Sequence, residues 1–435
     1  MSVGLQRLRE DAETLRRGAE AKGEDPTVVD RAVEADVRRR QLASESDGLK
    51  AQRNELSRAV GQALKSGAVP DGPEVDGLKA RSAEVGQRIE ALAADLAAVQ
   101  AELDDLLLRI PNPPDPDVPV GGEEDSVIVR TWGDPPPHEG RDGRVVRPHW
   151  EIAAELGLFD LAAGAKIAGS GFPLYRGAGA ALQRALIDFM VGLHTREHGM
   201  TEIWPPAVVN AASARGTGQI PDKEDLMYVV ERDDLYLVPT AEVPVTNIHR
   251  DEIIEAERLP IRYVAYSPCF RREAGAAGRE TRGILRVHQF DKVEMVCFER
   301  PADSGAALEW LTARAEVVLQ RLGLPYRVKL MASGDMGFVQ AKKYDLEAWA
   351  PGVEQWLEVS SVSNFRDYQA RRMDIRWRPE PGAKPEVLHT LNGSGLALAR
   401  TVAAMLEVHQ QPDGSVVVPE PLRATLGRER LGPGA

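Results

Sequence analysis

PCFRREAGAAGRETRGILRVHQFDKVEMV, from Pro268 to Val296, is the stretch that decides the fold of the larger part of this chain. It holds five arginines, three glutamates and three glycines. Its second half alternates between two sets of residues: Val287, Gln289, Asp291, Val293 and Met295, against His288, Phe290, Lys292 and Glu294. In a strand, two such sets point to opposite faces. The pattern predicts a long β-hairpin whose glycine-rich middle, with Gly275, Gly278 and Gly283, is a mobile loop.

The predicted hairpin presents side chains that suit a nucleotide: Arg271, Glu273, Arg286, Phe290 and Glu294. Arginines suit a polyphosphate, an aromatic ring suits a base, and carboxylates suit an amine or a divalent metal. A salt-bridged surface hairpin is the alternative reading of this segment taken by itself. The rest of the chain has to decide between the two.

The bulk properties are those of a globular protein with two or three domains. The chain has 435 residues, of which 43% are hydrophobic and 28% are charged. Its net charge of -13 argues against bulk affinity for nucleic acid, so no DNA partner is expected, although a local basic face remains open. Cys269 and Cys297 have no zinc-ligand spacing and are expected to be small buried residues. No apolar run is long enough for a membrane span and the N-terminus lacks a signal core, so a cytoplasmic location is expected.

Residues 28–110 are predicted to form two long helices. In the second, two sets recur every seven residues: Leu78, Val85, Leu92, Val99 and Leu106, and Ile89, Leu96, Leu103 and Ile110. The first carries Leu42, Leu49, Leu56 and Ala63 at the same spacing. The breaker SGAVPDGP (Ser66 to Pro73) separates them. The two helices are therefore expected to fold back as an antiparallel coiled-coil hairpin, about 50 Å long at about 1.5 Å per residue.

The first of these helices is rich in basic residues: Arg31, Arg38, Arg39, Arg40, Lys50, Arg53, Arg58 and Lys65. Positive side chains on a rigid rod suit a phosphate backbone, where binding is largely electrostatic. Dimerisation, or plain spacing, is the alternative role of such an arm, and acidic residues are interleaved with the basic ones.

The proline-rich stretch IPNPPDPDVPVGG (Ile110 to Gly122) marks a boundary. We expect a helical arm over residues 1–110, a linker over 111–122 and a second domain over 123–435. Helical stretches at 177–198 and 304–322, among runs such as RYVAYSPCF, EQWLEVSSVSN and VLHTLNGSG, predict a mainly antiparallel sheet flanked by helices. No Walker A sequence occurs. A helix beginning near Leu396 would bring Arg400 to a turn, where it could reach an anion or pair with a carboxylate.

Four passages, in order, resemble class II aminoacyl-tRNA synthetases, and specifically the bacterial type of the seryl-tRNA synthetase family. The stretch from Pro268 looks like motif 2, and it is accompanied by PTAEVPVTN (Pro239 to Asn247), LEVSSVSNFRDYQARRM (Leu357 to Met373) and HTLNGSGLALAR (His389 to Arg400). The resemblance covers essentially the whole chain and implies an α+β fold, with a coiled-coil arm that grips tRNA and a class II catalytic domain. Residues 184–206 look like motif 1, which implies a homodimer.

The activity implied by the resemblance is ATP-dependent formation of seryl-adenylate from L-serine, followed by transfer to the 3′ end of the serine tRNA. Whether the selenocysteine tRNA is also a substrate stays open. Arg271 matches the arginine that holds the α-phosphate, Arg400 the one that holds the γ-phosphate, and Glu358 with Ser361 the position that binds ATP and Mg²⁺. The other positions matching the ATP site are Arg272, Glu273, Arg286, Val287, Phe290, Val359 and Ser360. Those matching the serine site are Thr240, Ala241, Glu242, Glu294, Asn392 and Ser394.

Two departures from the family pattern stand out. The family commonly has a small residue where this chain has Arg272, and a strand would turn that side chain away from Arg271. The stretch between GTGQIPDKED and LYLVPT is compact. Three alternatives remain: a specialised paralogue, such as one serving an antibiotic pathway or resistance; an adenylate-forming homologue that loads a carrier protein; and a non-catalytic coiled-coil RNA-binding homologue. The intact arm argues against the carrier-loading protein.

Overall fold

The computed structural model describes residues 3–139, 143–273 and 282–432. Two compact units make up the chain: residues 1–20 with 24–111, and residues 21–23 with 112–435. The loop predicted for the middle of the motif 2 segment falls mostly on 274–281, outside the described residues. None of the helices within the described ranges is long and apolar enough to cross a membrane.

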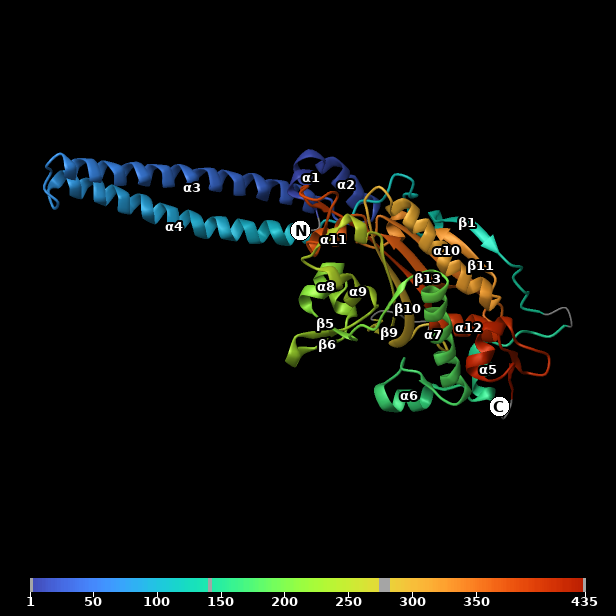
Figure 1. Cartoon of the computed structure of the whole chain (residues 1–435). Coiled ribbons are helices and arrows are strands. Elements are labelled where there is room, and N and C mark those ends of the chain that lie inside the picture. The colour runs from blue at the N-terminus through green and yellow to red at the C-terminus, as the bar shows by residue number, and fades with distance from the viewer. Residues whose placement is uncertain (1–2, 140–142, 274–281, 433–435) are drawn as a thin grey trace. The chain divides into compact units, whose positions relative to one another are not determined.

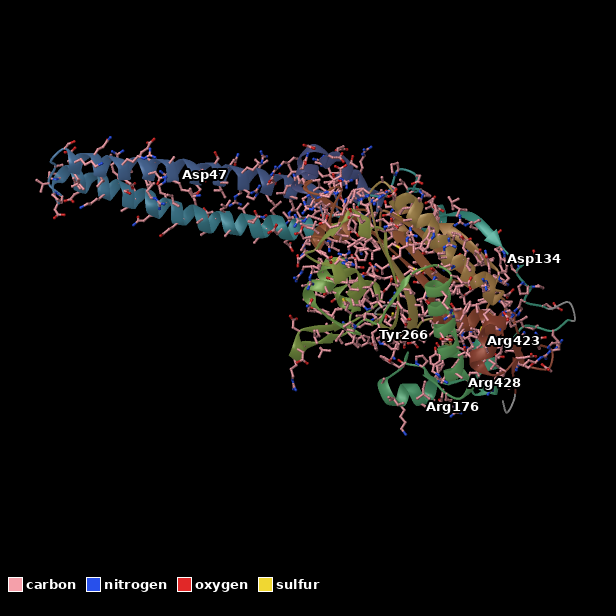
Figure 2. All side chains as sticks on the ribbon, in the orientation of Figure 1. Asp47, Asp134, Arg176, Tyr266, Arg423 and Arg428 are labelled. Carbon is pink, nitrogen blue, oxygen red and sulfur yellow. The ribbon has the colours of Figure 1, made fainter. Side chains whose placement is uncertain are left out.

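The first unit contains the predicted antiparallel hairpin. Its helices are α1 (Leu5–Glu10), α2 (Ala12–Ala21), α3 (Thr27–Lys65) and α4 (Pro73–Leu108). Figure 1 shows α3 and α4 side by side along their lengths. Between them lie the predicted heptad residues Leu49, Leu56, Leu78, Val85, Ile89 and Leu92. Pro73 begins α4, where the missing proline N–H has no intrahelical partner to lose. Charged side chains point outward along both helices, as for Asp47 in Figure 2.

The open end of the hairpin has an apolar core that the heptad pattern alone did not predict. Leu8 of α1 and Leu15 of α2 are fully buried against Val29 of α3 and Leu107 of α4. Helices as short as α1 and α2 are marginal in water, so this packing is what stabilises them. Ile110, which the heptad pattern placed in the seam, lies beyond the end of α4 and is buried in this core.

Asp36 of α3 binds three arginines in the first unit. Its side chain is only 2% exposed, and both of its oxygens accept hydrogen bonds from Arg9, at 2.7 and 2.8 Å. Arg39 and Arg40 donate to it as well, each at 3.1 Å. The hydrogen bond from Arg9 is the main reason why the pKa of Asp36 falls to about 2. This carboxylate therefore stabilises the fold when ionised.

Replacing Asp36 with Asn should destabilise the first unit by about 2 kcal/mol at neutral pH, the free energy that corresponds to the lowered pKa. In the parent chain this stabilisation is full above the ordinary aspartate pKa and is lost as pH falls toward 2. Hydrogen exchange of α1 and α3 amides in the full chain measures the effect. Asp47→Asn is the matched control, because Asp47 is exposed and, in the part of the chain that the structure describes, its ion pair is with Lys50 alone. Equal loss of protection in both variants would contradict the prediction.

The second unit is built on one eight-stranded sheet. The strands, in spatial order, are β1 (Val127–Trp132), β11 (Tyr326–Leu330), β12 (Lys342–Ala350), β13 (Gln355–Asn364), β16 (His389–Ala397), β10 (Gln289–Glu299), β9 (Ile261–Phe270) and β4 (Thr201–Ile203). Every neighbouring pair is antiparallel except β4 and β9. The mainly antiparallel sheet expected from the sequence is thus confirmed.

Helices cover the face of the sheet that carries the main core. They are α5 (His149–Leu156), α7 (Ala178–Arg196), α10 (Ser304–Leu322), α12 (Leu398–Val408) and α13 (Glu420–Leu426). Val293, Met295 and Cys297 of β10 point into this core. Both predicted helical stretches are present, as α7 and α10.

The opposite face of the sheet carries a smaller core and the cavity described below. Val296 and Phe298 of β10 pack there against Val245 of α9 (Glu242–Thr246) and Ala370 of α11 (Tyr368–Arg372). The other α-helices in the described ranges are α6 (Leu161–Ala168) and α8 (Ala211–Thr217). Two small sheets have two strands each: β2 (Phe159–Asp160) with β3 (Leu174–Tyr175), and β17 (Val416–Val417) with β18 (Arg430–Leu431). In a third, β14 (Arg376–Arg378) lies between β8 (Ile253–Glu255) and β15 (Glu386–Val387). In a fourth, β7 (Leu235–Leu237) lies between β5 (Val208–Asn210) and β6 (Val229–Val230).

The motif 2 segment follows the predicted alternation on β10, and both cysteines are buried and free, as expected. The strand before it is shorter than its sequence suggested. β9 ends at Phe270, and Glu273 has a left-handed backbone, with φ of 47°. Arg271 to Glu273 therefore leave the strand and turn along the rim of the cavity.

Candidate active site

A cavity of about 600 Å³ lies on the second face of the sheet. Its walls come from β10, β13, β16, the start of α12 and the segment 218–227. Nearly all of the predicted site residues line it: Thr240, Glu242, Arg271, Glu273, Arg286, Val287, Phe290, Glu294, Glu358, Val359, Ser360, Ser361, Asn392, Ser394 and Arg400. The structure thus brings four distant passages of the sequence to one place.

Two predicted site residues do not line the cavity. Ala241 is fully buried in the smaller core, behind the cavity wall. Arg272 donates a hydrogen bond of 3.0 Å to the carbonyl of Asp225 on the exposed rim. The physical reason is that neighbouring residues of an extended chain point in opposite directions, so Arg272 faces away from Arg271 and the cavity, and β9 has ended by this point.

One end of the cavity is rich in hydrogen-bond acceptors. The amide nitrogen of Asn392 donates to Glu242 at 2.8 Å and to Glu294 at 3.1 Å. Because both partners are acceptors, the amide orientation is settled and the Asn392 oxygen faces the other way. That oxygen is buried and accepts no hydrogen bond from the described residues. Two carboxylates and one unsatisfied oxygen therefore suit a small ligand with several donors.

The two carboxylates differ in their electrostatic partners. Glu294 lies 2.5 Å from the ammonium of Lys292, which also donates to Thr240 at 2.8 Å. Within the described ranges, the Glu242 carboxylate accepts hydrogen bonds only from amides, those of Asn392 and, at 2.6 Å, of Gln369. Burial and the nearby charge of Glu294 raise the pKa of Glu242 to about 7. A ligand cation beside Glu242 would stabilise its ionised form and lower its pKa again.

Three arginines line the other end of the cavity. The Arg271 guanidinium lies over the Phe290 ring, at 5.1 Å from its centroid. Arg400 donates to the carbonyl of Leu285 at 3.0 Å and to that of Glu358 at 3.1 Å. Arg286 pairs with Glu273 at 2.6 Å. Guanidinium groups held in this way beside an aromatic ring suit a nucleotide polyphosphate.

Glu358 and Ser361 form an oxygen-rich site beside Arg400. The Ser361 hydroxyl is 3.0 Å from Glu358 and 2.5 Å from Asp345. Burial opposes ionisation of Glu358, but the charges of Lys343 and Arg400 outweigh it and lower its pKa. Carboxylate and hydroxyl oxygens are donors that fit Mg²⁺. No group of three His, Cys, Asp or Glu residues suited to a metal occurs in the described ranges, so substrate phosphates would have to complete the coordination.

Several polar residues of the site were missed in the sequence. They are Gln219, Lys223, Lys292, Asp335, Gln340, Lys343, Asp345, Ser363 and Gln369. Lys292 shares the parity of Glu294, so the alternation could have revealed it. Asp345 pairs in register with Ser361, a contact that needs the strand partners to be known. Burial lowers the pKa of Lys223, which comes from an irregular segment with no periodic signal.

Two family models match this chain. The seryl-tRNA synthetase N-terminal domain matches residues 4–114, and the tRNA synthetase class II core domain (G, H, P, S and T) matches residues 228–409. Among curated proteins, the serine–tRNA ligase of Thermomicrobium roseum is 52% identical over 432 residues, covering 99% of this chain and 95% of the relative. That of Geobacillus kaustophilus is 51% identical, covering 97% of both.

Solved structures show the same likeness over the full length. The seryl-tRNA synthetase of Pyrococcus horikoshii, solved in complex with ATP, is 37% identical, with a TM-score of 0.92 and complete coverage of both chains. The cytoplasmic serine–tRNA ligase of Naegleria fowleri, solved with AMP, is 28% identical, with a TM-score of 0.89 and coverage of 100% of this chain and 99% of the other. From its motifs, its fold and these relatives, the chain belongs to the seryl-tRNA synthetase family.

Proposed function

We propose that this chain is a serine–tRNA ligase that joins L-serine to the 3′ end of the serine tRNA at the expense of ATP. In the first step a serine carboxylate oxygen attacks the α-phosphorus of ATP, the bond to the β-phosphate oxygen breaks, and pyrophosphate leaves. In the second step a terminal ribose hydroxyl of the tRNA attacks the seryl carbonyl and AMP leaves. One observation carries the proposal: a single cavity joins an acceptor-rich pocket to converging arginines.

The acceptor-rich end matches the donors of serine. Serine offers three N–H bonds from its ammonium group and one O–H. No described residue places a cationic side chain in contact with Glu242, so we assign the ammonium to it. Glu294 is already compensated by Lys292, and with the Asn392 oxygen it can accept from the hydroxyl. Alanine would leave these buried acceptors unpaired, which is the physical basis for rejecting it.

The arginine end would align ATP for in-line displacement. Little covalent chemistry falls to the protein in this step, and the barrier falls through positioning and charge stabilisation. We assign the α-phosphate to Arg271 and the γ-phosphate to Arg400. The adenine would stack on Phe290, with Glu273 and the backbone at Val287 reading its edge, and Arg286 as a further phosphate ligand. Val359 and Ser360 complete the wall beside Glu358.

Glu358 and Ser361 are the proposed holders of Mg²⁺. When bound, the ion would neutralise charge on the leaving phosphates. Glu358 is ready to contribute a negative oxygen, because Lys343 and Arg400 lower its pKa. Arg400 also lies near Glu358, at 3.7 Å between their charged atoms, so Arg400 would be close to a phosphate that contacts an ion held by Glu358.

Amino-acid-dependent ATP–pyrophosphate exchange tests the activation step. Serine should support exchange strongly, and alanine, threonine, cysteine and glycine should support it weakly or not at all. Exchange with serine alone would establish both the chemistry and the pocket. Folded protein that shows no exchange with any of the five amino acids, in the presence of magnesium, would instead indicate a degenerate homologue.

The pH dependence of the KM for serine tests the assignment of Glu242. Serine's ammonium needs the ionised carboxylate, and Glu242 is half protonated near pH 7. The KM for serine should therefore rise about tenfold between pH 8 and pH 6. In Glu242→Gln the KM should be high at both pH values and should lose this dependence. If the parent KM stays constant, the ammonium binds to another group.

The remaining partners are proposed from the first unit and from motif 1. The basic side chains of α3, Arg38 and Arg53 among them, suit the phosphate backbone of a tRNA arm. We propose a homodimer through motif 1, which ends beside Trp204, a residue that directly follows β4 and is 78% exposed in the single chain. The proposed location is the cytoplasm, where serine, ATP and tRNA meet.

A further inference from the structure

A buried histidine outside the cavity connects two elements of the second unit. His149, at the start of α5, is fully buried. Its Nδ1 lies 2.8 Å from a carboxylate oxygen of Glu407 on α12. Its Nε2 receives the backbone N–H of Ile284 at 3.3 Å. The helices α5 and α12 are in contact.

These partners leave His149 only one tautomer. Glu407 can only accept at Nδ1, so the imidazole must carry its proton there, and the N–H of Ile284 requires Nε2 to be unprotonated. Glu407 is held in turn, because it also accepts backbone N–H bonds from His149 at 2.9 Å, Gly352 at 2.8 Å and Val353 at 3.2 Å. The imidazole is thus fixed in its orientation and its tautomer.

The chain contacted by His149 is the return limb, which we define as residues 282–287. Gly283 has φ of 69°, and a Cβ atom there would lie 2.3 Å from Nε2 of His149, so only glycine fits. The guanidinium of Arg282 lies over the ring of Trp150, at 4.9 Å from its centroid. Three successive residues of the limb are therefore in contact with the first turn of α5.

The same limb carries groups that belong to the cavity. The carbonyl of Leu285, one residue beyond Ile284, accepts the Nε–H of Arg400 at 3.0 Å. Arg286 and Val287 line the cavity directly. We propose that His149, oriented by Glu407, is a positioning residue for ATP. Its contacts with Gly283 and Ile284 fix the position of the return limb, and the Leu285 carbonyl of that limb orients the Arg400 guanidinium toward the phosphates. The inference rests on the proposed function.

Steady-state ATP–pyrophosphate exchange, with ATP and serine varied separately, tests this role. His149→Ala should lower kcat/KM for ATP by about tenfold to a hundredfold, the loss expected when a phosphate ligand is misplaced by a fraction of an ångström. The KM for serine should stay unchanged, because Glu242, Glu294 and Asn392 have no contact with the limb among the described hydrogen bonds. His249→Ala is the control: it also removes a buried histidine paired with a glutamate, at 2.6 Å, although Glu252 is 35% exposed, and no hydrogen bond among the described residues joins His249 to the limb.

Two conservative variants keep the test decisive if the alanine variant does not fold. His149→Asn keeps an amide donor near Nδ1 and loses the acceptor for Ile284, whereas His149→Gln can place an oxygen near Nε2. Recovery of the ATP parameters by glutamine and not by asparagine supports the proposal. Equal ATP parameters in these two variants, or a parallel fall for ATP and serine, would overturn it. Absence of serine-dependent exchange in the parent chain would refute the proposed function instead.

Discussion

Arg271→Ala will lower kcat/KM for ATP in pyrophosphate exchange by at least about a hundredfold, while Arg272→Ala will change it by less than about twofold. The two arginines are neighbours in the sequence and have the same charge. Only Arg271 lines the cavity, where its guanidinium lies over the Phe290 ring. Arg272 donates instead to the carbonyl of Asp225 on the rim.

The size of the Arg271 effect follows from the chemistry of the step. Negative charge moves onto the α-phosphate oxygens and the leaving pyrophosphate, in a cavity where a fixed guanidinium needs no reorganisation. Lysine in place of Arg271 should restore little, because a single ammonium cannot reproduce the planar two-pronged contact. Initial-rate exchange assays on the three variants, each shown to be folded by circular dichroism, measure the outcome. Equal losses in Arg271→Ala and Arg272→Ala would mean that bulk charge, rather than position, attracts ATP.

The neighbouring arginines also show where sequence reasoning stops. The alternation on β10 correctly separated Val293 and Met295, which face the main core, from Phe290 and Glu294, which face the cavity. Period-two patterns are local, so they can be read without the fold. Where β9 ends is not a local property, and beyond that end Glu273 has a left-handed backbone that alternation does not predict.

The difference between Glu242 and Glu294 could be predicted from the sequence only in part, because alternation places Lys292 beside Glu294 but nothing places Gln369 beside Glu242. What distinguishes them is Lys292, which compensates one carboxylate, and Gln369, which gives the other only an amide. Gln369 is 127 residues from Glu242 along the chain, so no spacing rule joins them. Likewise α1 and α2 are stabilised by burial of Leu8 and Leu15 against the hairpin helices, which is a tertiary effect.

Shortening the arm should separate the two half-reactions. The shortened chain lacks residues 46–87 and has a short glycine–serine turn in their place. These ends can be joined because Glu45 of α3 and Arg88 of α4 are in contact, at 3.3 Å. The apolar core that buries Leu8 and Leu103 lies outside the deletion, so the first unit keeps the core at the open end of the hairpin. Serine-dependent exchange should remain within about twofold of the parent rate, because the cavity lies wholly in the second unit.

Transfer of serine to tRNA should fall by at least about a hundredfold in kcat/KM for tRNA, since the deletion removes Lys50, Arg53, Arg58 and Lys65. Two lost charge-assisted phosphate contacts are worth about 3 kcal/mol or more, which is about two powers of ten in affinity. Charge reversal of Arg53 and Arg58 to glutamate in the full-length arm is the companion variant, because it keeps the helix and changes only its charge. If shortening the arm abolished exchange as well, the arm would be needed for the fold of the second unit. If tRNA charging survived both changes, the tRNA would have to be held by the second unit alone.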